Sequence, residues 1–201
     1  MTVKIWQIKK EIRAIGVDDA PFTSKVRGQK VMVVGAILRG GQWLEGILRT
    51  YITLDGNDAT IELAEMINKS KHKDQLRVIL LNGITLGGFN VVNIKELFKK
   101  TGIPVIAVTR RYPDFKKIKK ALENFSDKKA RWKAVKVAGN VYEVKSKAEE
   151  NPVYIQLAGL QKKDATKIVQ ITSSRSIVPE PIRIAHLIVS GVVKGESVGR
   201  A

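Results

Sequence analysis

The chain has 201 residues, 44% of them hydrophobic and 27% charged, which is a globular composition with enough length for one well-buried core. Thirty-six Lys and Arg outweigh nineteen Asp and Glu, so the formal net charge is +17. The lack of cysteine excludes disulfides, thiolate metal sites and a cysteine nucleophile.

The chain is predicted to open with three strands. Apolar runs rich in β-branched residues, each bounded by turn residues, lie at 11–18, 30–39 and 43–54. Gly40 and Gly41 separate the second run from the third, and both positions of a tight turn tolerate positive φ at glycine. We therefore expect an antiparallel meander.

Helices and strands then alternate. Helices are predicted at 59–69 and from 93 to 102, and strands at 76–81 and 104–109. Such alternation implies parallel strands with right-handed crossovers. The predicted fold class is α/β, with a mixed sheet of antiparallel strands 1–3 and then parallel strands 4–5, flanked by helices.

The segment 110–147 is strongly basic, with thirteen Lys and Arg against four acidic residues. Phe115, Ile118, Leu122 and Phe125 recur at helical spacing, and a second helix is predicted around Trp132. We assign the lysines to the surface and the rings to packing, although an exposed ring could stack on a base. Short strands near 141–144 and 153–157 and helices near 162–172 and 180–193 follow. Without repeats or linkers, residues 1–201 are predicted to form a single domain.

Polar residues end neighbouring predicted strands. Asp18 ends the first strand and Asn82 the fourth, while Asp55 and Asp58 lie between the third strand and the next helix. Converging oxygen ligands suit Mg²⁺, and two such ions support phosphodiester hydrolysis. The structural alternative is also open: Asp58 is a natural N-cap, Asp55 begins a turn with Gly56, and Asp18 simply ends a strand.

Two further segments are candidates for phosphate binding. The loop 81–90 contains Gly87 and Gly88, whose backbone N–H groups could cradle a phosphate, although it matches neither known nucleotide-binding fingerprint and could be a close-packed turn. Arg175 and Arg183 lie at the start of the last helix, where the alternative is a helix cap. His186 follows on an apolar helix. It is a candidate base or a group that supports a metal ligand, although a core histidine with its hydrogen bonds satisfied is the more frequent outcome.

The charge makes nucleic acid, DNA or RNA, the leading partner. The candidate contacts are Gly87, Gly88, Arg110, Arg111, Lys116, Lys120, Arg175 and Arg183. The alternative is a cell with a salty or hot interior that uses many lysines as solvated surface. Residues 1–10 lack a secretory apolar stretch and no run is long enough to span a bilayer, so a cytoplasmic protein without a membrane partner is expected.

Three segments carry a resemblance to a known family: 16–22 (GVDDAPF), 81–92 (LNGITLGGFNVV) and 172–187 (TSSRSIVPEPIRIAHL). Through them the chain resembles the archaeal domain-of-unknown-function family 99 over nearly its whole length. That family is similar in fold to endonuclease V, which has a ribonuclease H-like core and cuts inosine-containing nucleic acids with Mg²⁺. The resemblance therefore implies a ribonuclease H-like mixed sheet and a Mg²⁺ cofactor.

The resemblance also implies site residues. Asp18 resembles the first-strand metal aspartate of endonuclease V, and Asn82 stands where that family has a second metal aspartate. Asp55 or Asp58 is the nearest match to the acid before the first helix, which gives Asp18, Asp55 and Asn82 as the metal set. Because Asn82 offers a neutral carbonyl in place of an anion, Mg²⁺ binding should be weaker.

Three hypotheses follow. The first is a nucleic-acid-binding protein with an endonuclease V-like fold, in which Asn82 impairs catalysis. The second is an active Mg²⁺-dependent endonuclease acting on inosine-containing or otherwise modified nucleic acid. The third is an interaction module whose basic face docks an acidic protein. The oligomeric state stays open.

Overall fold

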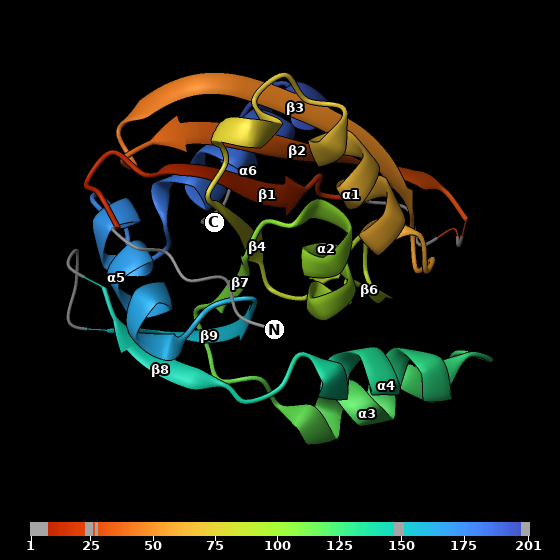
Figure 1. Cartoon of the computed structure of the whole chain (residues 1–201). Coiled ribbons are helices and arrows are strands. Elements are labelled where there is room, and N and C mark those ends of the chain that lie inside the picture. Colours follow the sequence, from red (N-terminus) through yellow and green to blue (C-terminus); the bar gives the residue numbers. More distant parts are fainter. Residues whose placement is uncertain (1–7, 23–25, 27, 147–150, 198–201) are drawn as a thin grey trace.

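A seven-stranded mixed sheet runs through the molecule (Figure 1), seen here in a computed structural model that describes residues 8–22, 26, 28–146 and 151–197. The N-terminal residues 1–7 and Lys147, at the end of the basic segment, lie outside the described residues. In spatial order the strands are β3 (Trp43–Thr53), β2 (Lys30–Arg39), β1 (Arg13–Asp19), β4 (Val78–Asn82), β7 (Val105–Thr109), β9 (Pro152–Ala158) and β8 (Tyr142–Lys145).

The strand directions confirm the predicted mixed sheet. β2 is antiparallel to β1 and β3, whereas β4 and β7 run parallel to β1. β9 and β8 extend the sheet beyond β7 with antiparallel pairing. Because β1, β4 and β7 point the same way, Asp18, Asn82 and Thr109 lie at one edge of the sheet, which we call the C-terminal edge.

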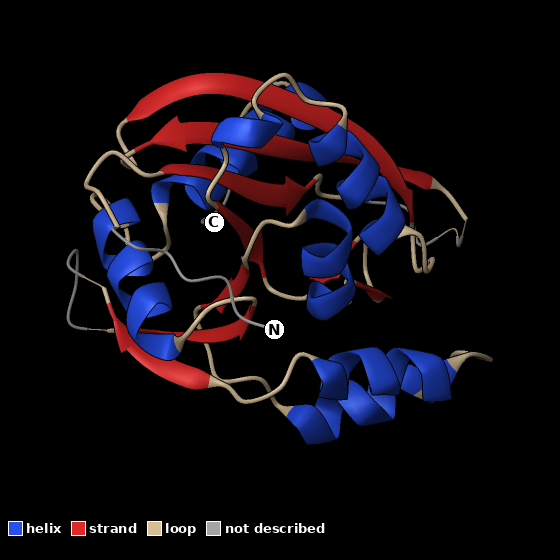
Figure 2. Cartoon of the chain, in the orientation of Figure 1, coloured by secondary structure: helices blue, strands red, loops and turns tan. Residues whose placement is uncertain are grey.

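Helices cover both faces of the sheet (Figure 2). They are α1 (Ala59–Asn68), α2 (Ile94–Thr101), α3 (Phe115–Leu122), α4 (Lys128–Val137), α5 (Lys162–Thr172) and α6 (Glu180–Lys194). Successive strand side chains point to opposite faces. Ile15 and Ile79 share one apolar cluster with Leu63 of α1, while Leu80 shares another with Ile182 of α6. Burial on both faces explains why the central strands are continuous apolar runs.

Helix α6 lies unusually close to β1. A Cβ atom on Gly16 would overlap the backbone of Pro181 and Ile182. Only a residue without a side chain permits this approach, and it brings the first turn of α6 directly onto the strand. The next turn of α6 therefore reaches the C-terminal edge.

Small elements depart from the prediction. The glycine-rich loop contains a two-stranded hairpin, β5 (Thr85–Leu86) and β6 (Asn90–Val91), and a 3₁₀ helix, Lys73–Gln75, precedes β4. After β7 the chain leaves the C-terminal edge and forms α3 and α4, which lie as a pair beside the sheet at the lower right of Figure 1. Within the described ranges, no helix has both the length and the apolar character needed to cross a membrane.

Candidate active site

Asp18 joins two other polar side chains at the C-terminal edge. Its Oδ1 accepts a hydrogen bond from Asn82 Nδ2 at 3.0 Å, and its Oδ2 lies 2.8 Å from Nδ1 of His186. The Asp18 side chain is only 4% exposed, against 18% for that of His186. A buried carboxylate with a partner on each oxygen is held in one orientation.

Strand pairing explains why Asp18 meets Asn82. β1 and β4 are adjacent and parallel, with Val17 opposite Leu81, so the next residue of each strand lies on the face covered by α6. The prediction that Asp18 and Asn82 end neighbouring strands is therefore confirmed. His186 comes from α6, and it reaches Asp18 because that helix lies close to Gly16. No local sequence pattern predicts this approach of the helix. His186 is thus a largely buried histidine with a hydrogen-bonded partner, as the structural alternative describes, and that partner is the Asp18 carboxylate.

The donor set of this cluster suits a hard divalent cation only in part. It offers one carboxylate from Asp18 and, after rotation of its amide, one carbonyl oxygen from Asn82. Mg²⁺ is usually bound through one or two carboxylates, substrate phosphate oxygens and water. The residues therefore fit a cation that a substrate phosphate helps to hold, with one negative charge fewer than a pair of aspartates would give.

Asp58 has other partners. Its carboxylate accepts hydrogen bonds from the amide and hydroxyl of Thr53, from Asn90 Nδ2 and from Lys30. Partial burial raises the pKa of Asp58, but these hydrogen bonds outweigh it and lower the pKa to about 2. Asp58 occupies the N-cap position of α1 without a side-chain capping bond, and the Oδ1 of Asn90 accepts from the Ala59 amide instead.

Asp55 lies in the loop after β3 and contacts the glycine-rich hairpin. Its Oδ1 accepts from the Phe89 amide at 2.9 Å, and its own φ is +55°. A Cβ on Gly88 would overlap this carboxylate. In the ranges that the structure covers, no three or more His, Cys, Asp and Glu residues are grouped so that they could hold a metal. Of the expected metal set of Asp18, Asp55 and Asn82, the structure joins Asp18 to Asn82 and gives Asp55 a separate partner.

Two amides of the glycine-rich loop, those of Gly87 and Phe89, donate to aspartates of the protein itself. Gly87 N–H donates to Asp19 Oδ2 at 2.8 Å, on the face opposite to His186. Burial, and then the charge of neighbouring Asp18, raises the pKa of Asp19 to about 6. With Gly87 bonded to Asp19 and Gly88 packed on Asp55, the close-packed turn describes these contacts, and a phosphate at the Gly87 amide would have to replace Asp19.

The basic candidates fall at two places. Arg110 and Arg111 are exposed directly after β7, at the C-terminal edge, and Lys116 and Lys120 are exposed on α3. Arg175 and Arg183 instead border a hollow of about 550 Å³ beside Trp43. Since Arg39 at the end of β2 pairs with Arg13 at the start of β1, this hollow lies at the opposite edge of the sheet.

Arg183 is also committed within the protein. It forms a 2.7 Å ion pair with the buried Glu180, whose other oxygen accepts from the Arg175 amide. The helix cap that we expected as the structural alternative is not formed by a side chain, because Pro179 is the N-cap of α6 and makes no side-chain capping bond. Glu180 holds the preceding segment instead, through the Arg175 amide. His186 is the residue of the segment 172–186 that reaches the C-terminal edge, where it contacts Asp18.

Comparison with known sequences gives one consistent family. A sequence profile described as endonuclease dU matches residues 10–193. A UPF0215 protein of Methanothermobacter thermautotrophicus is 53% identical over 196 residues, which cover 97% of this chain and 94% of that protein. A UPF0215 protein of Methanosarcina acetivorans is 51% identical, with 98% of each chain covered.

Solved structures give the fold. A protein of unknown function from Archaeoglobus fulgidus has a TM-score of 0.81 at 39% identity, covering 90% of this chain and 98% of that one. Human endonuclease V has a TM-score of 0.64 at 16% identity, covering 96% and 91%. Endonuclease V of Ciona intestinalis, solved with a DNA containing an inosine, has a TM-score of 0.62 at 15% identity, covering 92% and 87%. The fold is therefore endonuclease V-like.

Proposed function

This chain belongs to the endonuclease dU family, and from that membership we propose that it is a divalent-metal-dependent endonuclease that cuts nucleic acid at the C-terminal edge. The observation that carries the proposal is the bridge of Asp18 between Asn82 and His186. It combines an oriented carboxylate, an amide and an imidazole in a partly open position, which is the minimum for metal-assisted hydrolysis of a phosphodiester.

Each side chain has a distinct task in this proposal. Asp18 and Asn82 would hold the cation, and His186 Nδ1 holds the Asp18 carboxylate in place through Oδ2. When bound, a divalent cation supplies an activated water and neutralises charge that develops on the phosphate. Asn82 contributes a neutral oxygen, so a substrate phosphate has a larger share in holding the cation than it would beside two aspartates.

The proposed substrate is a nucleic acid with a deaminated base. The family description names an endonuclease and dU, the usual abbreviation of deoxyuridine, and the Ciona protein was solved with an inosine-containing DNA. Uracil and hypoxanthine both arise when an exocyclic amine is replaced by a carbonyl oxygen. Arg110 and Arg111, exposed where β7 ends beside Asn82, are the proposed phosphate contacts, since β4 pairs with β7 in parallel.

A cleavage assay tests the proposal. Labelled oligonucleotides carrying one deoxyuridine, one deoxyinosine or only normal bases are incubated with the protein and Mg²⁺ or Mn²⁺. We expect a single cut near the modified base that chelation of the metal abolishes. Asp18→Asn, which keeps the size of the side chain, should lower the rate by at least about a hundredfold. A rate that Asp18→Asn leaves unchanged would contradict the proposal.

A second candidate function is binding without turnover. The feature that favours it is Asn82, because the cluster then carries one carboxylate where two would attract a divalent cation more strongly. In the same assay, this candidate predicts retention of the modified oligonucleotide in an uncut complex. Its affinity would fall steeply with added salt, as counterion release requires.

A further inference from the structure

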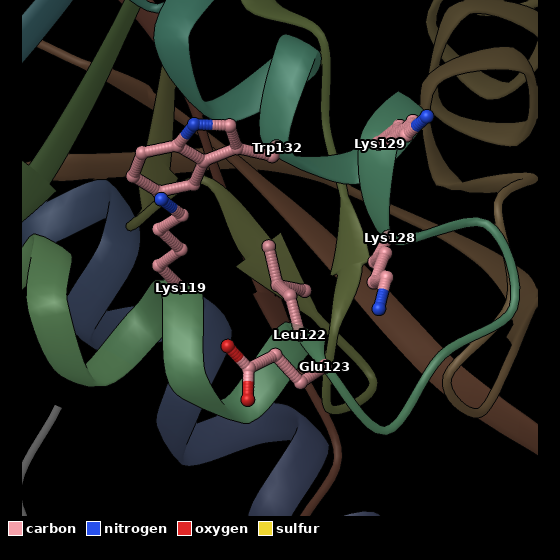
Figure 3. A pocket seen from close by; sticks show the side chains of 6 residues that line it. All are labelled: Lys119, Leu122, Glu123, Lys128, Lys129 and Trp132. Atoms are coloured by element: carbon pink, nitrogen blue, oxygen red, sulfur yellow. The ribbon is translucent and has the colours of Figure 1, made fainter.

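The helical pair α3–α4 carries a hollow with an apolar floor and a basic rim (Figure 3). Its volume is about 280 Å³, and its lining residues are Lys119, Leu122, Glu123, Lys128, Lys129 and Trp132. In Figure 3 the side chain of Lys119 extends toward the indole ring of Trp132, with Leu122 between Trp132 and Lys128. Sites for drug-sized ligands span roughly 300–1,000 Å³, so this hollow suits something smaller, such as one planar ring.

The indole ring of Trp132 is held rather than loose. Trp132 packs against an apolar cluster that contains Leu122, Phe125 and Val135, yet it still lines the hollow. The assignment of the rings to packing is therefore incomplete for Trp132. An aromatic ring fixed by its own packing loses little side-chain freedom when a second ring stacks on it, which favours stacking.

Charge complementarity indicates a polyanion as the occupant. Residues 110–137 contain eleven Lys and Arg and three Asp and Glu. Lys117 pairs with Asp114, and Arg131 pairs with Asp127. No ion pair involves Lys119, Lys128 or Lys129 in the part of the chain that the structure describes, so these three lysines, which line the hollow together with one acid, Glu123, are available for phosphates.

The position of the pair matches a role beside the active site. α3 begins a few residues after β7 ends at the C-terminal edge. Arg131, on α4, is buried and donates to the backbone carbonyls of Asp55, Gly56 and Phe89. These carbonyls belong to the loop after β3 and to the glycine-rich hairpin. The hydrogen bonds of Arg131 therefore hold α4 against the C-terminal edge of the sheet. Arg131 is thus a buried arginine in a segment whose lysines we assigned to the surface.

We propose that the α3–α4 hollow binds an unpaired base of the nucleic-acid strand beside the cleavage site, with the base stacked on Trp132 and adjacent phosphates on Lys119, Lys128 and Lys129. This inference rests on the proposed function and adds to it a preference for a strand with at least one unstacked nucleotide. Stacking on an aromatic ring tolerates any base, so the hollow contributes affinity and placement and leaves base selection to another part of the site.

The test is a titration of fluorescein-labelled oligothymidylate of about ten nucleotides, followed by anisotropy. Trp132→Ala should weaken binding roughly 5- to 150-fold, the range of one lost base stack, whereas Trp132→Phe should retain most of the affinity. The matched control is Trp43→Ala, which removes an exposed tryptophan at the opposite edge and should leave affinity unchanged. Circular dichroism checks that each variant is folded.

Charge reversal tests the lysines without touching the apolar floor. Lys128→Glu with Lys129→Glu should reduce the slope of log affinity against log salt concentration by about 1 to 2, while Lys99→Glu, on the exposed side of α2, should not. Polyglutamate serves as a competitor with charge but no rings. If it displaces the oligonucleotide equally well from the wild type and from Trp132→Ala, stacking is overturned and charge alone remains.

The outcomes separate this inference from the proposed function. If the wild type cleaves and binds but Trp132→Ala binds as tightly, only the inference about the hollow is overturned. If the wild type binds no oligonucleotide in any form, the proposed function is overturned as well. Weaker binding of Trp132→Ala to oligothymidylate, with duplex binding unchanged, supports the hollow as a site for an unpaired base.

Discussion

Asp18 and Asp19 are adjacent in β1, and their carboxylates serve opposite faces of the sheet. Asp18 contacts Asn82 and His186 on the α6 face, while Asp19 accepts from the Gly87 amide on the other. Side chains alternate between the faces along a strand, so the two neighbouring acids have different partners. Asp18 belongs to the candidate site, and Asp19 holds the glycine-rich loop. The two can therefore be compared by the same substitution.

Asp19→Asn is expected to leave cleavage within a few-fold of the wild type. The Asn side chain still offers an oxygen to the Gly87 amide, so the glycine-rich hairpin keeps its contact. Asp18→Asn, one residue earlier, should lose at least about a hundredfold in rate. Both variants are assayed on the deoxyuridine oligonucleotide with Mg²⁺, and equal loss in both would contradict the division between the faces.

Asn82→Asp should strengthen metal binding. A second carboxylate beside Asp18 adds an attraction of roughly 1 to 4 kcal/mol per unit charge on the cation, which predicts at least about a tenfold gain in Mn²⁺ affinity by calorimetry. Without metal, two close carboxylates repel, so the melting temperature should fall and recover when Mg²⁺ is added. Asn140→Asp, at an exposed position, is the control that should change neither quantity. Unchanged affinity in Asn82→Asp would argue against a cation at this place.

The sequence predicted the parts of this molecule that depend on neighbours along a strand. The apolar runs and turn glycines gave β1 to β4 and β7, and the strand order then placed Asp18 beside Asn82. His186 was undervalued because its contact depends on how α6 lies on Gly16, far away in sequence.

The sequence failed where a hydrogen-bonding partner is distant along the chain. Asp55 contacts the Phe89 amide and Asp58 contacts Asn90, across 34 and 32 residues, so both acids looked like free candidates for a metal. Burial of Arg131 is similar, since its carbonyl partners lie more than 40 residues away. The spacing of residues along a short segment cannot predict hydrogen bonds to such distant partners.

Asp58 should make stability fall at acid pH. Its pKa is about 2 in the folded state and about 3.9 in the unfolded state. Ionised Asp58 therefore contributes fully to the free energy of unfolding above the unfolded pKa, and this contribution is lost as the pH falls through 2. Asp58→Asn should therefore cost about 2 kcal/mol in the free energy of unfolding near pH 7. The difference from the wild type should disappear near pH 2. Urea denaturation across this range measures both, and a difference that is constant with pH would show that the charge is irrelevant.

Gly16→Ala tests the close approach of α6. The added Cβ overlaps the backbone of Pro181 and Ile182, which no rotamer relieves, so α6 must move. We expect a loss of about 1 to 3 kcal/mol in stability, and reduced cleavage because His186 moves with the helix. Gly191→Ala lies on the same helix, where the new Cβ would lie 3.2 Å from the hydroxyl and 3.9 Å from the backbone nitrogen of Ser197, and should be nearly neutral. Equal stability of the two variants would contradict the packing argument.

The proposed role of His186 is to position Asp18, and its substitutions can distinguish that role from proton transfer. His186→Ala removes the partner of Asp18 Oδ2 and should lower cleavage about 10- to 100-fold, with Mn²⁺ affinity falling in parallel. His186→Asn places an amide where Nδ1 lies and can donate the same hydrogen bond, although it cannot carry a mobile proton.

If orientation of Asp18 is the whole role, His186→Asn restores most of the rate and Mn²⁺ affinity that His186→Ala loses, and the pH profile of cleavage keeps its wild-type shape. If His186 instead transfers a proton, the Asn variant binds Mn²⁺ normally but stays as slow as the Ala variant, and one limb of the pH profile disappears. Because Asp18 has its other oxygen on Asn82, the carboxylate keeps one anchor in every variant. We therefore expect the restored rate, and a slow Asn variant with intact metal binding would replace the positioning role with a catalytic one.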